Sequence, residues 1–172
     1  MTQTAPTAPG APGAPGAPGA LAAVNVSRVI RAPRRAVFNA WRDPAIFSKW
    51  WLNQRREAPM ALHLDARPGG KYCIVMTSEC GPEHNAPSDY RWVIDGEFLE
   101  VVEPERLVFT WRVNDPGVQP TDQRVTVRFE DHPDGTLVSI THTGIVAPHV
   151  HKGTVEGWGE MLGYLAGALE AT

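Results

Sequence analysis

Four strand-like segments follow one another in the second half of the chain with only short turns between them. They are Tyr90–Val102, Leu107–Val113, Arg124–Glu130 and Thr136–Thr143. Each is rich in β-branched and aromatic residues or alternates apolar with polar ones, and the connections are rich in Pro, Gly, Asp and Asn. A parallel pairing usually needs a helical crossover, and no helical pattern lies between these segments. The pattern therefore predicts an antiparallel meander.

The meander is followed by a segment whose apolar residues recur at helical spacing. Large apolar side chains return every three or four residues from Val155 to Leu169, which places them on one face of an α-helix. Five glycines lie between residues 153 and 167, and each costs up to about 1 kcal/mol relative to Ala in a helix interior. Packing must compensate, and the small residues let another element approach closely. The segment predicts one long amphipathic helix.

The segments before the meander predict a strand, two short helices and two further strands. Leu21–Ile30 is rich in Val and Ile, and Pro33 ends this strand because proline has no amide donor. Apolar residues at helical spacing continue to Trp41, and Asp43-Pro44 then stops the first helix and starts a second one through Trp50. The remaining segments alternate as two strands joined by a turn, namely Met60–Asp65, Arg67–Gly70 and Lys71–Met76.

The first twenty residues differ in composition from the rest. Residues 8–19 repeat the triplet Ala-Pro-Gly four times, without a charge or a large apolar side chain. A collagen triple helix would need many more triplets and three chains, so we expect a disordered, partly polyproline-like tail. The roughly 150 residues that remain are enough for one domain with its own core. We therefore expect a tail over residues 1–20 and one folded domain over residues 21–172.

Charge and cysteine usage narrow the class of protein. The net charge of −3 leaves no positive excess to neutralise a phosphate backbone, so nucleic acid is not an expected partner. No apolar run approaches the roughly 18 residues of a membrane helix, so we expect no membrane insertion. Cys73 and Cys80 are spaced neither as a zinc site nor as a redox motif. With no recognisable signal segment, we expect a soluble cytoplasmic protein with free thiols, a disulfide between them being the alternative.

Short motifs distributed along the chain add a resemblance to a known family. They are Arg31-Ala32-Pro33, Val37–Trp41, Asp43-Pro44, Trp50-Trp51, Leu64–Tyr72, Gly96–Glu100, Pro104–Trp111, Gly135-Thr136, Thr141-His142 and Gly157-Trp158. In this order, from about Val24 to Glu170, they resemble the family named after the activator of the heat-shock-protein-90 ATPase, within the START-like or SRPBCC superfamily.

The resemblance implies an α+β fold of the helix-grip type. In this fold a curved antiparallel sheet wraps around a long C-terminal helix, two short helices follow the first strand, and a cavity commonly lies between the sheet and the last helix. The superfamily includes lipid carriers, hormone receptors and polyketide cyclases, and the family includes co-chaperones. The co-chaperones carry a further N-terminal domain that contacts the chaperone. Here the Ala-Pro-Gly tail stands in that place, which argues against a chaperone partner.

Strand alternation predicts which side chains point towards the terminal helix. The inward set is the more apolar one and includes Ile74 and Phe109, although a bulge, for instance at Gly96, would exchange the two faces beyond it. Several tryptophans around a cavity suit a flat hydrophobic ligand, and plain core packing is the alternative. The candidate ligand-binding residues are Tyr72, Met76, Trp92, Phe98, Trp111, His142, Trp158 and Met161.

His142 is the only histidine that alternation places inward. It is a candidate to orient one polar atom of a ligand or to exchange a proton near pH 7, and a hydrogen-bonded core histidine is the alternative. His149 and His151 bring no carboxylate at ligand spacing, so no metal is expected. The polar segment Asp65–Gly70 is expected to serve the turn itself. No nucleophile elbow, Walker motif or dinucleotide-binding glycine motif occurs, so no catalytic residue or cofactor is predicted.

These features together predict a protein that binds a small hydrophobic or amphipathic molecule between the sheet and the terminal helix, without catalysis. Two alternatives remain open. One is a cyclase or dehydratase-like enzyme in which His142, with Tyr72 or Tyr90, guides proton transfer in the same cavity. The other is a co-chaperone or regulatory protein-interaction module. The ligand and the oligomeric state are not predicted.

Overall fold

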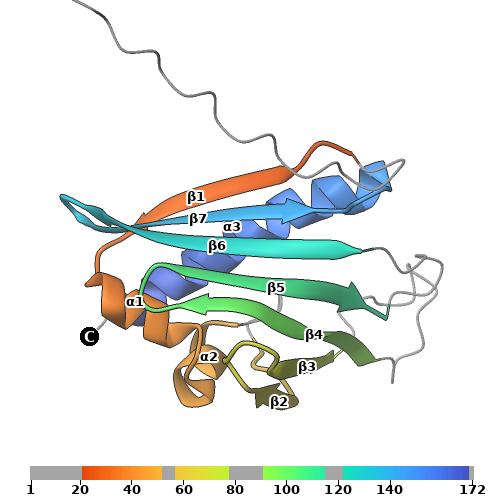
Figure 1. Ribbon diagram of the computed structural model, residues 1–172, viewed down its shortest axis with the longest axis horizontal. Coiled ribbons are helices and arrows are strands. Elements are labelled where there is room, and N and C mark those ends of the chain that lie inside the picture. Colours follow the sequence, from red (N-terminus) through yellow and green to blue (C-terminus); the bar gives the residue numbers. More distant parts are fainter. Residues whose placement is uncertain (1–20, 52–56, 78–90, 115–121, 171–172) are drawn as a thin grey trace, which may run out of the picture.

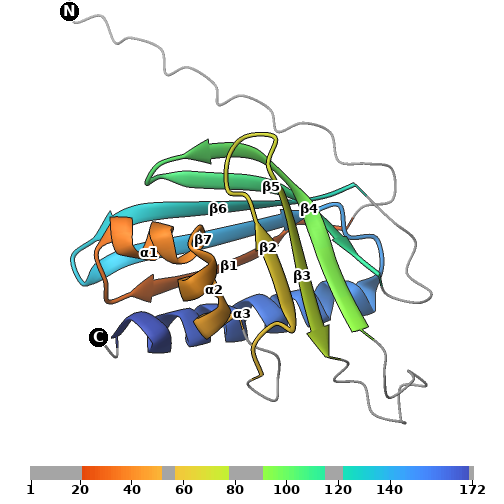
Figure 2. The ribbon, with the colours of Figure 1, turned by 90° about the horizontal axis from the view of Figure 1, so that it is seen from below.

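The predicted meander is present in the computed structural model, which describes residues 21–51, 57–77, 91–114 and 122–170. One sheet with the strand order β1-β7-β6-β5-β4-β3-β2 curves over three helices (Figures 1 and 2). The strands are β1 Val24–Ile30, β2 Ala61–Leu64, β3 Lys71–Thr77, β4 Arg91–Val102, β5 Arg106–Val113, β6 Gln123–His132 and β7 Gly135–Thr143. The helices are α1 Arg34–Ala40, α2 Pro44–Trp50 and α3 Pro148–Glu170. The expected α+β helix-grip architecture is confirmed.

Some of the expectations concern residues that the structure does not describe. The Ala-Pro-Gly tail, Cys80 and Tyr90 lie outside the described residues. Cys73 is a half-buried free thiol on β3. Within the described ranges, no helix is both long and apolar enough to cross a membrane.

The first strand joins the sheet beside the last one. β1 pairs with β7 along its whole length, from Val24 opposite His142 to Ile30 opposite Thr136. Alternate residues of β7 are buried, and His142 continues this series with only 1% of its surface exposed. The pairing therefore places His142 on the concave face, among apolar side chains.

Proline and aspartate set the starts of the two short helices. Pro33 stands in the extended conformation before α1, and the Asp43 side chain caps α2 by accepting a 2.8 Å hydrogen bond from the amide two residues later. Pro44 occupies the first turn of α2, where a missing amide hydrogen is tolerated. The indole Nε1–H of Trp50 donates to the carbonyl oxygen of Ala40 at 2.9 Å, which ties the second helix to the first.

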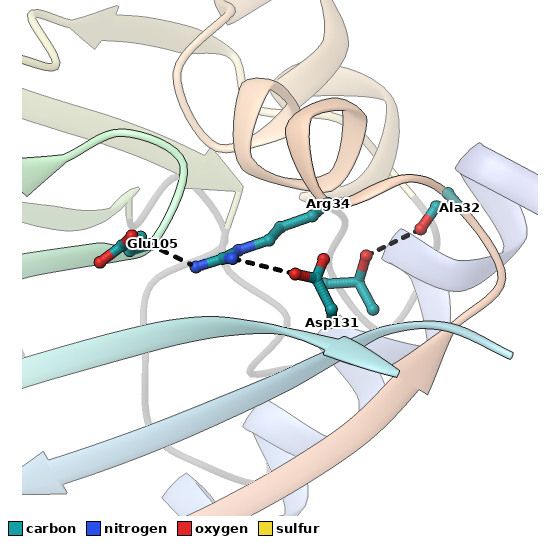
Figure 3. A network of polar contacts seen from close by, with 5 residues as sticks. Ala32, Arg34, Glu105 and Asp131 are labelled. Atoms are coloured by element: carbon teal, nitrogen blue, oxygen red, sulfur yellow. Dashed lines mark hydrogen bonds and ion pairs between the residues drawn. The ribbon is translucent and has the colours of Figure 1, made fainter. Parts of the chain in front are cut away.

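A polar network holds the start of α1 against the sheet (Figure 3). Nη1 of Arg34 lies 3.2 Å from Oδ2 of Asp131, and its Nη2 lies 3.8 Å from Oε1 of Glu105. Both carboxylates are largely exposed, so each pair contributes only about 0–1 kcal/mol. The hydroxyl of Thr136 is buried and donates to the carbonyl oxygen of Ala32 at 2.8 Å, which satisfies two polar groups inside the protein. These contacts fix the start of α1 against the sheet.

The terminal helix α3 lies along the concave side of the sheet and packs chiefly against β1, with further contacts to α2 (Figure 2). It buries Trp158, Leu162 and Leu165 on one face, as the apolar spacing predicts. Its glycines receive no close neighbour from the described residues. A Cβ atom at four of the five would meet open space within 4 Å, and at Gly163 it would meet only Nη1 of Arg28, at 3.9 Å. The buried apolar face is therefore what stabilises this helix.

A register shift in β4 decides which residues of its second half face the core. The pairing with β5 shifts between Phe98 and Glu100. Phe98 is buried, and Val101 also packs against the core. Three positions separate these two residues, so without the shift they would lie on opposite faces. The bulge follows Phe98 instead of Gly96, so alternation holds for the first half of the strand.

Gly96 occupies a position where β5 and a side chain of β3 come close. A Cβ atom there would overlap the carbonyl oxygen of Thr110 and lie 2.7 Å from Cε1 of Tyr72. Replacement of this glycine forces the sheet or the tyrosine ring to move.

We predict that Gly96→Ala lowers the free energy of unfolding by about 3 kcal/mol, because the backbone of β5 and a buried ring cannot both make room. Gly159→Ala is the matched control. Its Cβ meets open space, so the gain in helix propensity should raise stability by about 0.5–1 kcal/mol. Urea unfolding of the full chain measures both changes, and a loss below about 1 kcal/mol for Gly96→Ala would contradict the close approach.

Candidate functional site

Five of the six tryptophans of the chain meet on the concave face of the sheet. Ring centroids lie 4.9 Å apart for Trp41 and Trp50, 5.9 Å for Trp51 and Trp158, and 5.3 Å for Trp111 and Trp158. We call these five residues the tryptophan cluster. Aromatic contacts of this kind add about 0.5–1.5 kcal/mol each to the burial of the rings. The cluster joins α1, α2, β5 and α3 in one core.

A small cavity of about 20 Å³ lies beside this cluster, between the α1–α2 segment and strands β2–β5. That volume holds about one water-sized group. Seven of its nine lining side chains are aromatic. The lining consists of Trp41, Phe47, Trp51, Leu64, Tyr72, Ile74, Phe98, Phe109 and Trp111. The cavity is thus an aromatic pocket without a charged side chain in its wall.

Three of the eight predicted ligand-binding residues line the cavity, namely Tyr72, Phe98 and Trp111. A fourth, Trp158, stands behind its wall, with its ring centroid 6.2 Å from that of Trp41. The remaining four lie inward but outside the lining. Met76 and Trp92 face each other across β3 and β4, Met161 is half-buried on α3, and His142 packs against Trp111 at 5.5 Å.

Half of the six cavity residues absent from the predicted site come from the segment of the two short helices. Trp41, Phe47 and Trp51 lie on or next to α1 and α2, and strand alternation makes no statement about them. A sequence signal was present, because three tryptophans and a phenylalanine stand within eleven residues around Asp43-Pro44. On the strands, Ile74 and Phe109 were in the inward set, and Leu64 belongs to the alternating segment before the turn.

Both ring nitrogens of His142 have hydrogen-bond partners. Its Nδ1 accepts from the indole Nε1–H of Trp158 at 3.1 Å. An indole N–H can only donate, so the imidazole hydrogen lies on Nε2, which donates to Oε1 of Gln123 at 2.9 Å. Burial lowers the pKa of His142 to about 4. This histidine is therefore neutral near pH 7, and it joins β7 to α3.

The hydroxyl of Tyr72 is also engaged. It donates to the carbonyl oxygen of Thr110 at 2.7 Å. Burial raises the pKa of Tyr72 far above its ordinary value, and the Asp95 carboxylate acts in the same direction. The phenol thus remains protonated and positions its ring in the cavity wall.

The other polar features considered in the sequence analysis either stabilise a turn or lie outside the cavity lining. In the Asp65–Gly70 turn, the Nε–H of Arg67 donates to the Asp65 carboxylate at 2.9 Å, and Gly69 adopts a positive φ of 77°. His151 contacts the carbonyl oxygen of Ala22 through its Nε2. Among the described residues, no three His, Cys, Asp or Glu side chains come together as a metal site.

Comparison with known proteins agrees with this architecture. The family model described as Activator of Hsp90 ATPase homolog 1-like protein matches residues 31–170. No curated protein matches the chain. Protein CV1439 from Chromobacterium violaceum is 27% identical in sequence, with a TM-score of 0.69 over 90% of this chain and 99% of its own.

Two further solved structures share the fold at lower identity. An uncharacterised protein from Rhizobium leguminosarum is 21% identical, with a TM-score of 0.75 over 89% of this chain and 97% of its own. An AHSA1-like protein from Aeromonas hydrophila is 24% identical, with a TM-score of 0.67 over 87% of this chain and 93% of its own. Both cover nearly the whole of the fold described above.

The neutral state of His142 predicts how stability depends on pH. The unfolded chain takes up a proton at this residue near pH 6.5, whereas the folded chain does so only near pH 4. The contribution of His142 to the free energy of unfolding is fully present above about pH 6.5. It falls by up to about 1.4 kcal/mol per pH unit on acidification, and the fall ends below about pH 4. The total loss is about 3 kcal/mol.

Urea unfolding between pH 7 and pH 4 measures this dependence. His142→Gln cannot take up the proton, so we expect a shallower fall of stability with acid than in the unmodified chain, whatever its stability at pH 7. His63→Gln, at an exposed position, is the control and should keep the full slope. Equal slopes in the unmodified chain and His142→Gln would show that folding does not lower the pKa of this histidine.

Proposed function

Because this chain belongs to the family of Activator of Hsp90 ATPase homolog 1-like proteins, whose fold supports a ligand-binding or regulatory module, we propose that it binds a small hydrophobic or amphipathic molecule without a catalytic step. The proposed binding place is the aromatic cavity of the concave face, between the α1–α2 segment and strands β2–β5. The cytoplasmic location expected from the sequence remains a prediction of this proposal.

The observation that carries the proposal is the aromatic wall of the cavity. Aromatic rings offer wide apolar faces that suit a flat hydrophobic ligand. A protein core that serves stability alone gains from filling such a space, since an empty space forfeits dispersion contacts along its walls. Here a gap is left between seven aromatic side chains, one of which is the half-buried ring of Trp111.

The size of the cavity sets a condition on binding. A typical ligand pocket measures about 300–1,000 Å³, far more than the 20 Å³ present here. A ligand must therefore separate some of the aromatic side chains, and its own contacts must offset those that it breaks. Trp111 is the lining tryptophan that is only half-buried, so we expect its ring to move. Small ligands are favoured because they separate the fewest contacts.

The engaged polar groups argue for binding without chemistry. An enzyme of the cyclase or dehydratase type would need His142 or Tyr72 to exchange a proton with the substrate. Both nitrogens of His142 are occupied by Trp158 and Gln123, and the hydroxyl of Tyr72 is held by Thr110. The lowered pKa of the histidine and the raised pKa of the tyrosine oppose proton transfer near pH 7.

Native mass spectrometry of the purified full chain tests the proposal directly. We expect an apolar companion molecule that leaves on extraction with organic solvent, and a rise in melting temperature when a panel of lipids and small aromatics is added. A single unliganded mass, with no thermal shift across the panel, would overturn ligand binding and favour the regulatory interaction module.

A pair of tryptophan variants separates binding from packing. Trp111 and Trp92 are both half-buried on the inward face, on β5 and β4, but only Trp111 lines the cavity. We predict that Trp111→Ala weakens binding of the extracted companion at least tenfold. Trp92→Ala should leave that affinity within about twofold, while both variants lose about 2–4 kcal/mol of stability. Isothermal titration and urea unfolding measure the two quantities, and equal losses of affinity would point to a ligand held elsewhere.

A further inference from the structure

The inner surface of the aromatic cavity is entirely apolar, although several side chains of its wall carry polar groups. These groups are the indole nitrogens of Trp41, Trp51 and Trp111 and the hydroxyl of Tyr72. None of them forms part of the surface that encloses the space, which consists of carbon atoms alone. The cavity therefore offers no hydrogen bond to a group that enters it.

Polar groups close to the wall are used within the protein. The hydroxyl of Tyr72 donates to the carbonyl oxygen of Thr110 at 2.7 Å. Behind the wall, the indole Nε1–H of Trp158 donates to Nδ1 of His142 at 3.1 Å, and Nε2 of the same imidazole bonds to Gln123. Each of these hydrogen bonds would have to break before its group could serve a ligand.

The cavity is so small that a single group fills it. Its volume of about 20 Å³ holds about one water-sized group. A buried water molecule needs about two to four hydrogen-bond partners, and this surface provides none. A methyl group is of similar size, needs no such partner and gains dispersion contacts with the surrounding rings. The wall therefore distinguishes two groups of nearly equal size by their chemistry.

Transfer from water indicates how strong this distinction is. Surroundings that cannot hydrogen-bond disfavour a hydroxyl group by roughly several hundredfold or more, whereas surroundings that partly compensate for lost hydration disfavour it by at most about thirtyfold. An ion of either sign is disfavoured still more strongly, because no charged side chain lines the cavity to pair with it. A polar substituent of any kind thus lowers the affinity of a ligand for this place.

Resting on the proposed function, we propose that the ligand of the cavity is a small hydrocarbon, such as an alkylbenzene, without a hydrogen-bonding or charged group. An alkyl group of the ligand fills the gap between the rings, and its remaining part displaces the half-buried ring of Trp111. Alcohols, phenols, acids and ammonium compounds are excluded. Of the hydrophobic and amphipathic molecules that the proposed function includes, only the hydrophobic ones meet this condition.

Toluene and phenol test this assignment, because a methyl group in the first stands where the second has a hydroxyl of similar size. Isothermal titration of the full chain with each probe gives the ratio of the two Kd values. We expect toluene to bind more than about thirtyfold more tightly than phenol, as in surroundings that cannot hydrogen-bond. A ratio of about thirtyfold or less would overturn the assignment, since the bound ring would then meet water or a hydrogen-bond partner.

A pair of isoleucine variants locates the bound probe. Ile74 and Ile140 are both 1% exposed on the inward face, but only Ile74 lines the cavity. Ile74→Thr places a hydroxyl in the wall, so it should lower the ratio by about five- to tenfold, the value of one hydrogen bond. Ile140→Thr is the control and should leave the ratio within about twofold. Leu64→Thr, at a half-buried lining position, repeats the test if Ile74→Thr does not fold.

The remaining outcomes separate this assignment from the proposed function. If the lining variants change the ratio no more than Ile140→Thr does, the probes are held outside the cavity and the assignment fails. If neither probe binds although a companion molecule is extracted from the purified chain, the ligand class is wrong while ligand binding stands. If the companion molecule is absent as well, the proposed function fails and the ligand class fails with it.

Discussion

The structure depends on covering one apolar face of a curved sheet. All seven strands direct large apolar residues to the concave side, and that surface is stable only when helices exclude water from it. Three helices share the task, and the tryptophan cluster is where they meet the sheet. Each tryptophan brings a large apolar ring and one N–H donor into the core. The ring improves the packing, but the N–H needs a hydrogen-bond acceptor.

Two of the buried indoles find different kinds of hydrogen-bond acceptor. A helix-end carbonyl satisfies Trp50, and a neutral imidazole satisfies Trp158, which also explains why a histidine stands at a fully buried position of β7. The Nε1–H of Trp41 is buried without an acceptor among the described residues, and the ring of Trp41 forms part of the cavity wall. In the proposed function, stability and binding use the same side chains, and because the cavity is small, a ligand must compete with the contacts between the aromatic rings.

Prediction from the sequence succeeded where a repeating pattern reports directly on structure. Alternation identified Tyr72, Phe98 and Trp111 as inward residues, and all three line the cavity. It succeeded on β4 because the register shift comes after Phe98. Alternation could not identify Trp41 and Trp51 as cavity-lining residues, because they enter the wall from the ends of short helices whose packing direction no local pattern specifies.

The sequence by itself determined the order of strands and helices, the antiparallel meander and the inward face of β3–β7 up to the bulge in β4, because turns and hydrophobic periodicity are local properties of the chain. Only the tertiary structure decided that β1 pairs with β7, that His142 is neutral between Trp158 and Gln123, and that the ring of Trp41 lines the cavity. These features join residues about a hundred positions apart or depend on how rings of similar size share one space. Such contacts follow from the packing of the whole domain, and no segment encodes them alone.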